Sequence, residues 1–501
     1  MRLVSLGVRP LWYDEAFAVL FSEKGPDAML YGTLTPVAGG AADIHPLLYY
    51  GTLNAWMALF GQSPFAVRLW SALLGVATVG LMYLLGRDLF GEKTGLMAAF
   101  ITAIAPFQVQ YSQEARMYAL LGLLLAAATW CFVRGSRSLH TPAEAASPAS
   151  SRGNWLWWAA FGVLAGLAMY TQQLAAFYLI ALGLIPVLQR DWKLLLRAAA
   201  GALVAVSVYL PWLVNLPGQF DKVRSYYWLS PPNIGQLLLT ARSFLVVNLD
   251  IPAPGSMIGF VGALFMLAFL AVQVIVMMRR PRAERGALRL VLWLAAAPVA
   301  LMWLVSQLQP VYLIRGLLAS ALLLNLALAW LFTRGGLPRP VAGLIGLVWL
   351  ALAGIGLYNQ YTWATFPNSP FEEAVSAIGE QWQEGDIIIH QSKLSALPTV
   401  YYARALPQRY LRDLPGSGED TLALPTQETL GLLADETVEA AADGARRVWW
   451  VMFDFAERQY AAAGRSDLKA ALDWLEAHYD QSGQWSFNDL VVTLYADEEG
   501  S

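Results

Sequence analysis

The chain has 501 residues, of which 57% are hydrophobic and only 14% charged, and its formal net charge is −3. A soluble globular protein usually carries about 25% charged residues, so this composition excludes an ordinary soluble enzyme and indicates a polytopic membrane protein. The single cysteine, Cys131, excludes a disulfide or a cysteine-based metal site within one chain. The sequence contains neither a Gly-rich phosphate loop nor a nucleic-acid-binding signature. Membrane lipids are therefore the first expected partner, and nucleic acid is not one.

Charge divides the chain into two parts. Residues 1–363 carry 24 Lys and Arg against 13 Asp and Glu, whereas residues 364–501 carry 9 against 23. We therefore predict a basic membrane domain over 1–363, whose first outer loop occupies about residues 1–64. Residues 364–501 are predicted to form a soluble, acidic α/β domain.

The first polar motif, LWYDEAF, places Asp14 and Glu15 among aromatic and aliphatic residues. Charges are costly in such surroundings unless they are solvated, paired or used. Neighbouring residues point in different directions on a helix, so the two carboxylates are predicted to differ in role. One faces a reaction centre, and the other holds the backbone or caps a helix.

The second motif, DIHPLLYY, follows at positions 43–50. Its proline suits the first turn of a helix, and its tyrosines suit a membrane interface. Asp43 and His45 are each predicted either to cap that helix or to contact a ligand. The apolar run 46–60 is too short to span comfortably and is expected to lie in the interface.

A spanning helix needs roughly 17–25 mostly apolar residues. The pair 155–171 and 173–189 is short, which leaves a tight hairpin open as an alternative to two full crossings. A linker rich in Ser, Ala and Pro lies at 135–153, and its His140 is expected to be solvated. The ten predicted spans are 65–86, 94–111, 117–133, 155–171, 173–189, 193–214, 256–278, 288–308, 311–332 and 341–358.

Orientation follows from the basic residues, because Lys and Arg concentrate in cytoplasmic loops. If every predicted span crosses, 15 of the 24 Lys and Arg of residues 1–363 fall in alternate loops on one side. The other side then receives Asp14 and Glu15, the loop at 111–116, the long loop at 215–255 and the tail. We therefore predict a multi-pass protein of the plasma membrane, with its site and its C-terminal domain outside the cytoplasm.

Two further motifs fall on this outer side. In QVQYSQEARMYALL, at 108–121, Tyr111, either Glu114 or Ala115, and Tyr118 are predicted to share one helical face. Glu114 and Arg116 either belong to a site or form a local salt bridge at the interface.

The last motif, QLQPVYLIRGLLAS, places Arg315 about one turn into a span. A charged residue inside a membrane helix indicates a functional site by default. The alternative is that the Arg315 side chain extends along the helix to the lipid headgroups. A guanidinium at this place suits a lipid-linked phosphate.

The tail shows the patterns of a small α/β domain. Helices are predicted over 371–382 and 467–479, and strands over 385–390, 445–454 and 488–496.

The motifs LWYDEA, HPLLYY, YSQEARMYAL and QPVYLIRGLLAS, in this order, resemble those of polytopic glycosyltransferases with the GT-C fold. The resemblance covers about residues 5–360 and is greatest to the bacterial branch akin to protein O-mannosyltransferases and the lipid A aminoarabinose transferase. It implies an all-α polytopic membrane domain of about ten spans, followed by the α/β tail. It also implies sugar transfer, usually with inversion, from a polyprenyl-phosphate-linked donor to a hydroxyl of a glycan, lipid or protein acceptor.

The same resemblance assigns roles to individual residues. Asp14 is the base or acceptor-positioning carboxylate, and Glu114 orients the acceptor or a metal ion. Arg315, with Arg116 as the lesser candidate, holds the phosphate. No cofactor is assigned, and a divalent metal ion is left open, with Asp14 and Glu114 as its ligands if one binds. The remaining substrate-binding candidates are Glu15, His45, Tyr49 and Tyr118.

The chain departs from the family pattern in three places. Leu47 replaces a second proline, and Gly316 follows Arg315 where the family usually has tyrosine. The family has a full membrane helix before the acidic pair, whereas MRLVSLGVRP is too short to span, so we expect a first helix to be missing here.

Two other functions compete with sugar transfer. A transporter or flippase tends to place functional charges near the bilayer midplane, often in internal repeats, and neither feature is seen. A non-catalytic membrane anchor for the tail leaves the four polar motifs on one face unexplained.

Overall fold

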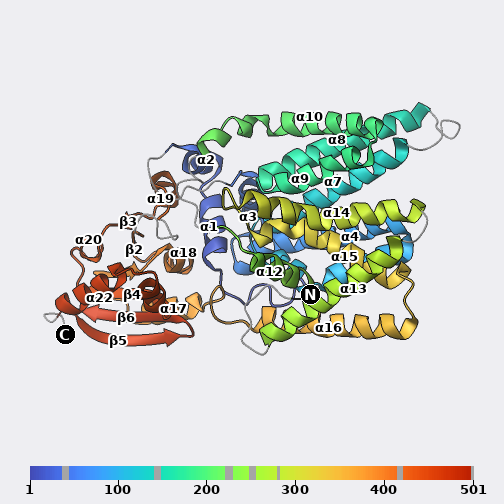
Figure 1. The fold of residues 1–501 in the computed structure, drawn as a ribbon. Helices are drawn as coiled ribbons and strands as arrows, with labels where there is room; N and C mark the ends of the chain where they lie inside the picture. Colours follow the sequence, from blue (N-terminus) through green and yellow to red (C-terminus); the bar gives the residue numbers. More distant parts are fainter. Residues whose placement is uncertain are drawn as a thin grey trace.

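The computed structural model describes residues 1–36, 45–139, 148–219, 229–246, 255–278, 282–413 and 421–497. Figure 1 shows a bundle of long helices with a small sheet domain at one end, next to the short helices of the first loop. Asp43 and His140, which the sequence analysis discussed, lie outside the described residues.

Three short helices form the first loop: α1 (Tyr13–Ser22), α2 (Pro26–Leu34) and α3 (Leu48–Phe60). Every residue of α1 from Asp14 to Ser22 is buried. A helix that is buried on all sides needs neighbours on all sides, and α1 packs against α3 and against helices of the tail. The acidic pair is therefore held inside protein and not at a solvated surface.

Six helical segments in the described residues are long and apolar enough to cross a membrane. They lie in α4 (Pro64–Phe90), α7 (Tyr118–Leu139), α10 (Trp192–Leu213), α14 (Arg282–Val305), α15 (Leu318–Arg334) with the short 3-10 helix (Ile314–Leu317) before it, and α16 (Arg339–Thr362). Three more predicted spans are helices with shorter apolar cores: α8 (Pro148–Thr171), α9 (Ala175–Gln189) and α13 (Gly255–Met278).

The predicted span over 94–111 is wrong as a single helix. The chain forms α5 (Glu92–Ile104) and α6 (Pro106–Ser112), with a break at Ala105. A residue before proline is disfavoured in the helical region, and Ala105 is accordingly extended, with ψ 120°. Helix α12 (Ile234–Leu245), inside the predicted long loop, was not expected.

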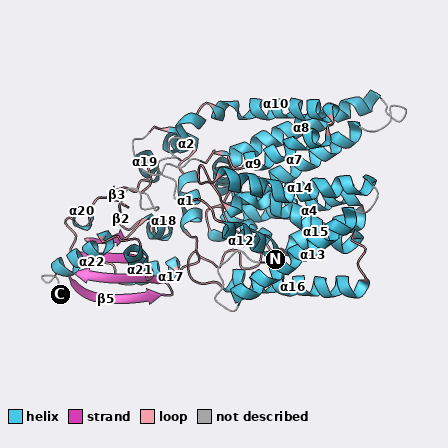
Figure 2. Cartoon of the chain, viewed as in Figure 1, coloured by secondary structure: helices cyan, strands magenta, loops and turns pink. Residues whose placement is uncertain are grey.

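The tail forms a six-stranded sheet with the order β3-β2-β1-β4-β6-β5. Strands β1 to β4 run parallel, and β6 and β5 add two antiparallel strands at one edge. Figure 2 shows helices around these strands. The predicted elements are confirmed as α17 (Phe371–Glu380), β1 (Asp386–His390), β4 (Arg447–Phe453), α22 (Asp467–His478) and β6 (Leu490–Ala496). Elements that were not predicted are α18 (Lys393–Tyr402), β2 (Gln408–Leu411), α19 (Leu424–Leu430), β3 (Ala434–Asp435), α20 (Val438–Ala441), α21 (Ala456–Ala462) and β5 (Asp480–Phe487).

The sheet domain is docked onto the first loop through α18 and α19, which pack on α1 and α2. The Leu11 amide donates to the Tyr402 hydroxyl at 2.9 Å, and Arg404 pairs with Glu23 at 2.6 Å. Because α18 follows β1 directly, the carboxyl ends of the parallel strands face α1. The first loop is thus enclosed between the bundle and the sheet, and the domain boundary at 363 stays a prediction.

Candidate functional site

The first, third and fourth sequence motifs supply an ion-paired centre at the start of α1, and the second motif lies next to it. Arg315 Nη1 donates to Asp14 Oδ2 at 2.6 Å, and Arg116 Nε lies 3.8 Å from the same oxygen. Arg116 Nη1 also donates to the backbone carbonyl of Asp14 at 3.2 Å. One buried carboxylate is therefore held by two arginines that lie 102 and 301 positions further along the chain.

Each of these side chains comes from the end of a helix. Asp14 lies in the first turn of α1, where the positive end of the helix dipole favours a carboxylate. Arg315 lies in the 3-10 turn that opens α15, and Arg116 in the segment between α6 and α7. The break at Pro106 matters here because it ends the preceding helix early and leaves residues 113–117 free to reach the first loop.

The two candidate catalytic acids differ in protonation. Burial acts to raise the pKa of Asp14, but Arg116 and Arg315, with a smaller contribution from His45, leave that pKa below its ordinary value. Burial raises the pKa of Glu114 to about 8. At pH 7 the site thus holds an ionised Asp14 and a protonated Glu114, which is the pairing expected of groups with different roles.

Several buried polar atoms around this ion pair have no protein partner in the described part of the chain: the Tyr118 hydroxyl, Arg315 Nε and Glu114 Oε2. The Arg315 guanidinium also lies over the Tyr118 ring, 5.2 Å from its centroid, a cation–π arrangement. Buried polar groups are normally paired, so unpaired ones gathered beside a fixed charge indicate a place for a polar ligand.

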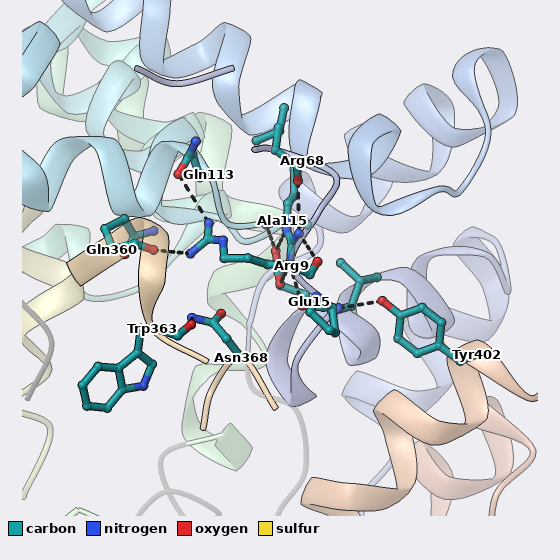
Figure 3. A network of polar contacts seen from close by, with 12 residues as sticks. Arg9, Glu15, Arg68, Gln113, Ala115, Gln360, Trp363, Asn368 and Tyr402 are labelled. Atoms are coloured by element: carbon teal, nitrogen blue, oxygen red, sulfur yellow. Dashed lines mark hydrogen bonds and ion pairs between the residues drawn. The ribbon is translucent and has the colours of Figure 1, made fainter. Parts of the chain in front are cut away.

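Glu15 belongs to a different network, drawn in Figure 3. Its two carboxylate oxygens accept from Arg68 at 2.8 and 2.6 Å, and one also accepts from the Ala115 amide at 2.8 Å. Both charged side chains are 1% exposed. Glu15 thus ties α1 to α4 and to the segment before α7, and its predicted part in substrate binding stays a prediction.

Sequence reasoning missed Arg68, although it lies one turn into the predicted span 65–86 and so carried the same signal as Arg315. The Arg68 guanidinium also donates hydrogen bonds to the first loop. The backbone carbonyls of Leu6, Arg9 and Pro10 accept from Arg68 at 3.1, 2.6 and 2.8 Å.

The tyrosines of the second motif lie close to the ion pair of Asp14 and Arg315. The Tyr49 hydroxyl is 3.3 Å from the hydroxyl of Ser71 on α4, whereas Tyr50, which was not among the site predictions, accepts from Arg116 Nη1 at 3.4 Å. The structure therefore brings Asp14, Glu114, His45, Arg116, Tyr118 and Arg315 together, and places Glu15 and Tyr49 beside them with other partners.

No group of three or more His, Cys, Asp or Glu side chains that suits a metal ion occurs in the ranges that the structure describes. An ion here would have Asp14 and Glu114 as carboxylate ligands, yet Asp14 already faces two arginines. The described donors fit an anion held by arginine better than a cation.

Gly316, where the chain departs from the family pattern, lies close to Leu174. A Cβ built at this glycine would lie 2.9 Å from Leu174 Cδ1, so a larger residue requires Leu174 to move. The segment after Arg315 packs closely against the turn between α8 and α9.

Residues 44–214 match the family of dolichyl-phosphate-mannose-protein mannosyltransferases. A Bacillus subtilis protein named as a mannosyltransferase, YkcB, is 31% identical over 229 residues, which are 42% of this chain and 29% of that protein. An undecaprenyl phosphate-alpha-4-amino-4-deoxy-L-arabinose arabinosyl transferase of Pseudomonas fluorescens is 28% identical over 191 residues, 36% of this chain and 32% of that protein. The chain thus spans about a third of the length of these curated relatives.

The fold is similar to that of a solved structure over almost the whole chain. ArnT from Cupriavidus metallidurans in the apo state has a TM-score of 0.64 at 14% identity, covering 98% of this chain and 95% of that one. The same protein bound to undecaprenyl phosphate has a TM-score of 0.61. At such low identity this likeness establishes the architecture, including the tail, and leaves the chemistry to be argued from the site.

Proposed function

Because the chain is a multi-pass membrane protein with the GT-C fold, related to protein O-mannosyltransferases and aminoarabinose transferases, we propose that it transfers a sugar from a polyprenyl-phosphate-linked donor to an acceptor hydroxyl. One observation carries the proposal: Asp14 is held at 2.6 Å by Arg315, at the junction of the first loop and the bundle. Sugar transfer by the purified chain in detergent, where no closed membrane exists, tests it. Transport alone gives no product under that condition.

In the proposed reaction, the acceptor oxygen forms a bond to the anomeric carbon while the bond from that carbon to the phosphate oxygen breaks. The acceptor proton passes to Asp14, and the bonding electron pair leaves with the polyprenyl phosphate. Attack from the side opposite the phosphate inverts the configuration. Negative charge grows on the leaving phosphate as the sugar becomes oxocarbenium-like, so a fixed cation such as Arg315 stabilises the transition state.

Arg315 suits this role because its planar guanidinium can hold phosphate oxygens at two nitrogens. Its Nη1 contacts Asp14, whereas its Nε is buried without a protein partner in the described residues. Arg116 adds a second positive charge close to Asp14. In this proposal Asp14 orients the arginine in the free protein and meets the acceptor hydroxyl in the complex.

The placement of basic residues supports a site outside the cytoplasm. The end of α15 and the start of α16, which carry Arg334 and Arg339, lie at the end of the bundle away from the sheet domain in Figure 1. Cytoplasmic loops are rich in such residues, so the opposite end, with Asp14 and the tail, is proposed to face outward across the plasma membrane. The acceptor, whether glycan, lipid or protein, is then reached on that side.

Arg315→Gln is expected to weaken binding of polyprenyl phosphate by about tenfold to a hundredfold, because it removes a charge-assisted contact. Titration of the purified protein with polyprenyl phosphate measures the change. Arg404→Gln is the matched control, since Arg404 also pairs with a carboxylate at 2.6 Å, but lies apart at the interface with the tail. Equal affinities of Arg315→Gln and the wild type for polyprenyl phosphate would show that Arg315 does not bind the donor phosphate.

The protonation of Glu114 leads to a pH prediction. As the pH rises through about 8, Glu114 ionises and adds a negative charge beside the phosphate site. The second ionisation of a phosphate monoester lies near pH 6, so the ligand's own charge is already constant there. Binding of polyprenyl phosphate is therefore expected to weaken several-fold between about pH 7 and pH 9. In the Glu114→Gln variant, the affinity for polyprenyl phosphate should not change between about pH 7 and pH 9. If this variant kept the pH dependence of the wild type, Glu114 would not be the group that ionises.

A further inference from the structure

A second polar pocket lies next to the proposed reaction centre. It is a partly open space of about 300 Å³, with solvent-filled space counted, between the first loop, α4, the segment before α7, the end of α16 and the start of the tail. Glu114 is part of its wall, and the pKa of Glu114 responds to Asp14 and Arg315, so the pocket and the reaction centre share this residue. The pocket is lined, among other residues, by Arg9, Trp12, Glu114, Gln360 and Asn368.

Three of the side chains that line this pocket carry buried polar atoms without a partner in the described ranges: Arg9 Nε, Trp12 Nε1 and Glu114 Oε2. The first two atoms are N–H donors, and the Glu114 carboxyl is protonated at pH 7, so it donates as well. The pocket is thus lined by three residues that each hold an unpaired donor, and such residues match a ligand that accepts hydrogen bonds.

The charges in the pocket also indicate a ligand that is an anion. Arg68 is neutralised by Glu15, whereas Arg9 makes no ion pair within the described residues. Arg9 Nη1 donates to the Gln360 backbone carbonyl at 3.3 Å and Nη2 to the Gln113 side-chain oxygen at 3.4 Å, as drawn in Figure 3. In the orientation of the Gln360 amide that satisfies both of its polar atoms, the side-chain oxygen also accepts from Nη1 at 2.7 Å, so these partners of Arg9 are neutral groups. Burial lowers the pKa of Arg9 to about 10, so it stays charged at pH 7. The pocket therefore carries one positive charge without a counter-charge.

We propose that this pocket binds an oxyanion group, phosphate or carboxylate, that is carried by the acceptor. The inference rests on the proposed glycosyl transfer and adds to it the chemical class of the acceptor. An anion held by Arg9 and Trp12 places the rest of the acceptor molecule along Glu114 toward Asp14. An acceptor hydroxyl near an anionic group is thus delivered to the base.

The test is a calorimetric titration of the full-length protein in detergent with inorganic phosphate, in the presence of saturating undecaprenyl phosphate to fill the site at Arg315. Wild type is expected to bind phosphate, and Arg9→Gln to bind it at least about tenfold more weakly. Trp12→Phe, which keeps an aromatic ring but loses the N–H together with the five-membered part of the indole, should weaken binding several-fold. Trp70→Phe is its matched control, because the Trp70 N–H is also buried and unpartnered in the described chain, but outside the pocket.

A second arm repeats the titration with glycerol phosphate. If the anion belongs to a larger acceptor, this monoester binds at least as well as inorganic phosphate, and the Arg9→Gln and Trp12→Phe variants weaken both. Binding of inorganic phosphate alone would overturn the acceptor assignment, and so would unchanged binding in both variants or no binding in the wild type. None of these titrations requires sugar transfer, so failure of the proposed function would be seen separately, in the activity of the purified protein.

Discussion

Asp14→Asn is expected to lower the rate of sugar transfer by about 10²–10⁴-fold, the range of a positioned general base. The amide keeps the size of the side chain and still accepts a hydrogen bond from Arg315, but it cannot take the acceptor proton. The initial rate of sugar release from the donor lipid by the purified protein measures the effect. Elution as a single species in size-exclusion chromatography shows that the variant is folded.

Asp27→Asn is the matched control for this variant. Asp27 is also a carboxylate in the first turn of a first-loop helix, but it is exposed and has no ion pair among the described residues. Its substitution should leave the rate unchanged. A full rate for Asp14→Asn would show that the base is another group.

The largest effect on stability is expected for Arg68→Met. This change leaves the Glu15 carboxylate buried and without its cation, and three first-loop carbonyls lose their donor. Removing one partner of a buried pair typically costs about 3–5 kcal/mol. Thermal unfolding in detergent should show a clearly lower midpoint than the wild type.

Arg87→Met, on the same helix, is the control for this loss. Arg87 pairs with Asp88 at 3.4 Å, but its side chain is 38% exposed, and such pairs contribute about 0–1 kcal/mol. The double variant Arg68→Met with Glu15→Met should recover part of the loss, because no unpaired charge remains. Equal midpoints for Arg68→Met and Arg87→Met would contradict the stabilising role of the buried pair of Arg68 with Glu15.

The sequence was sufficient to predict the membrane fold, the α/β tail and most of the charged centre. Motif order and sidedness indicated Asp14, Arg116 and Arg315 as members of one site, and the structure places them together. The prediction that Tyr111 and Tyr118 share one face of a helix is wrong, because they belong to separate helices, α6 and α7. Their rings nevertheless lie 5.2 Å apart.

The remaining features depend on contacts between distant segments, which a local pattern does not determine. The pairing of Glu15 with Arg68 joins residues 53 positions apart, and the docking of Tyr402 onto Leu11 joins residues 391 apart. The pocket around Arg9 is formed by five segments, including α4 and the start of the tail, so no single motif could indicate it. The break at Pro106 and the charge of Arg68 within a predicted span were available from the sequence by local rules.

In the proposed function, a polyprenyl-phosphate-linked sugar is consumed at Asp14. Mass spectrometry of the lipid-linked sugars and surface glycans of a strain lacking this gene tests this consumption. We predict that one lipid-linked sugar accumulates and one glycan modification disappears, and that both return to normal with the wild-type gene but not with Asp14→Asn. Unchanged lipid-linked sugars in the deletion strain, or full restoration by Asp14→Asn, would contradict the account.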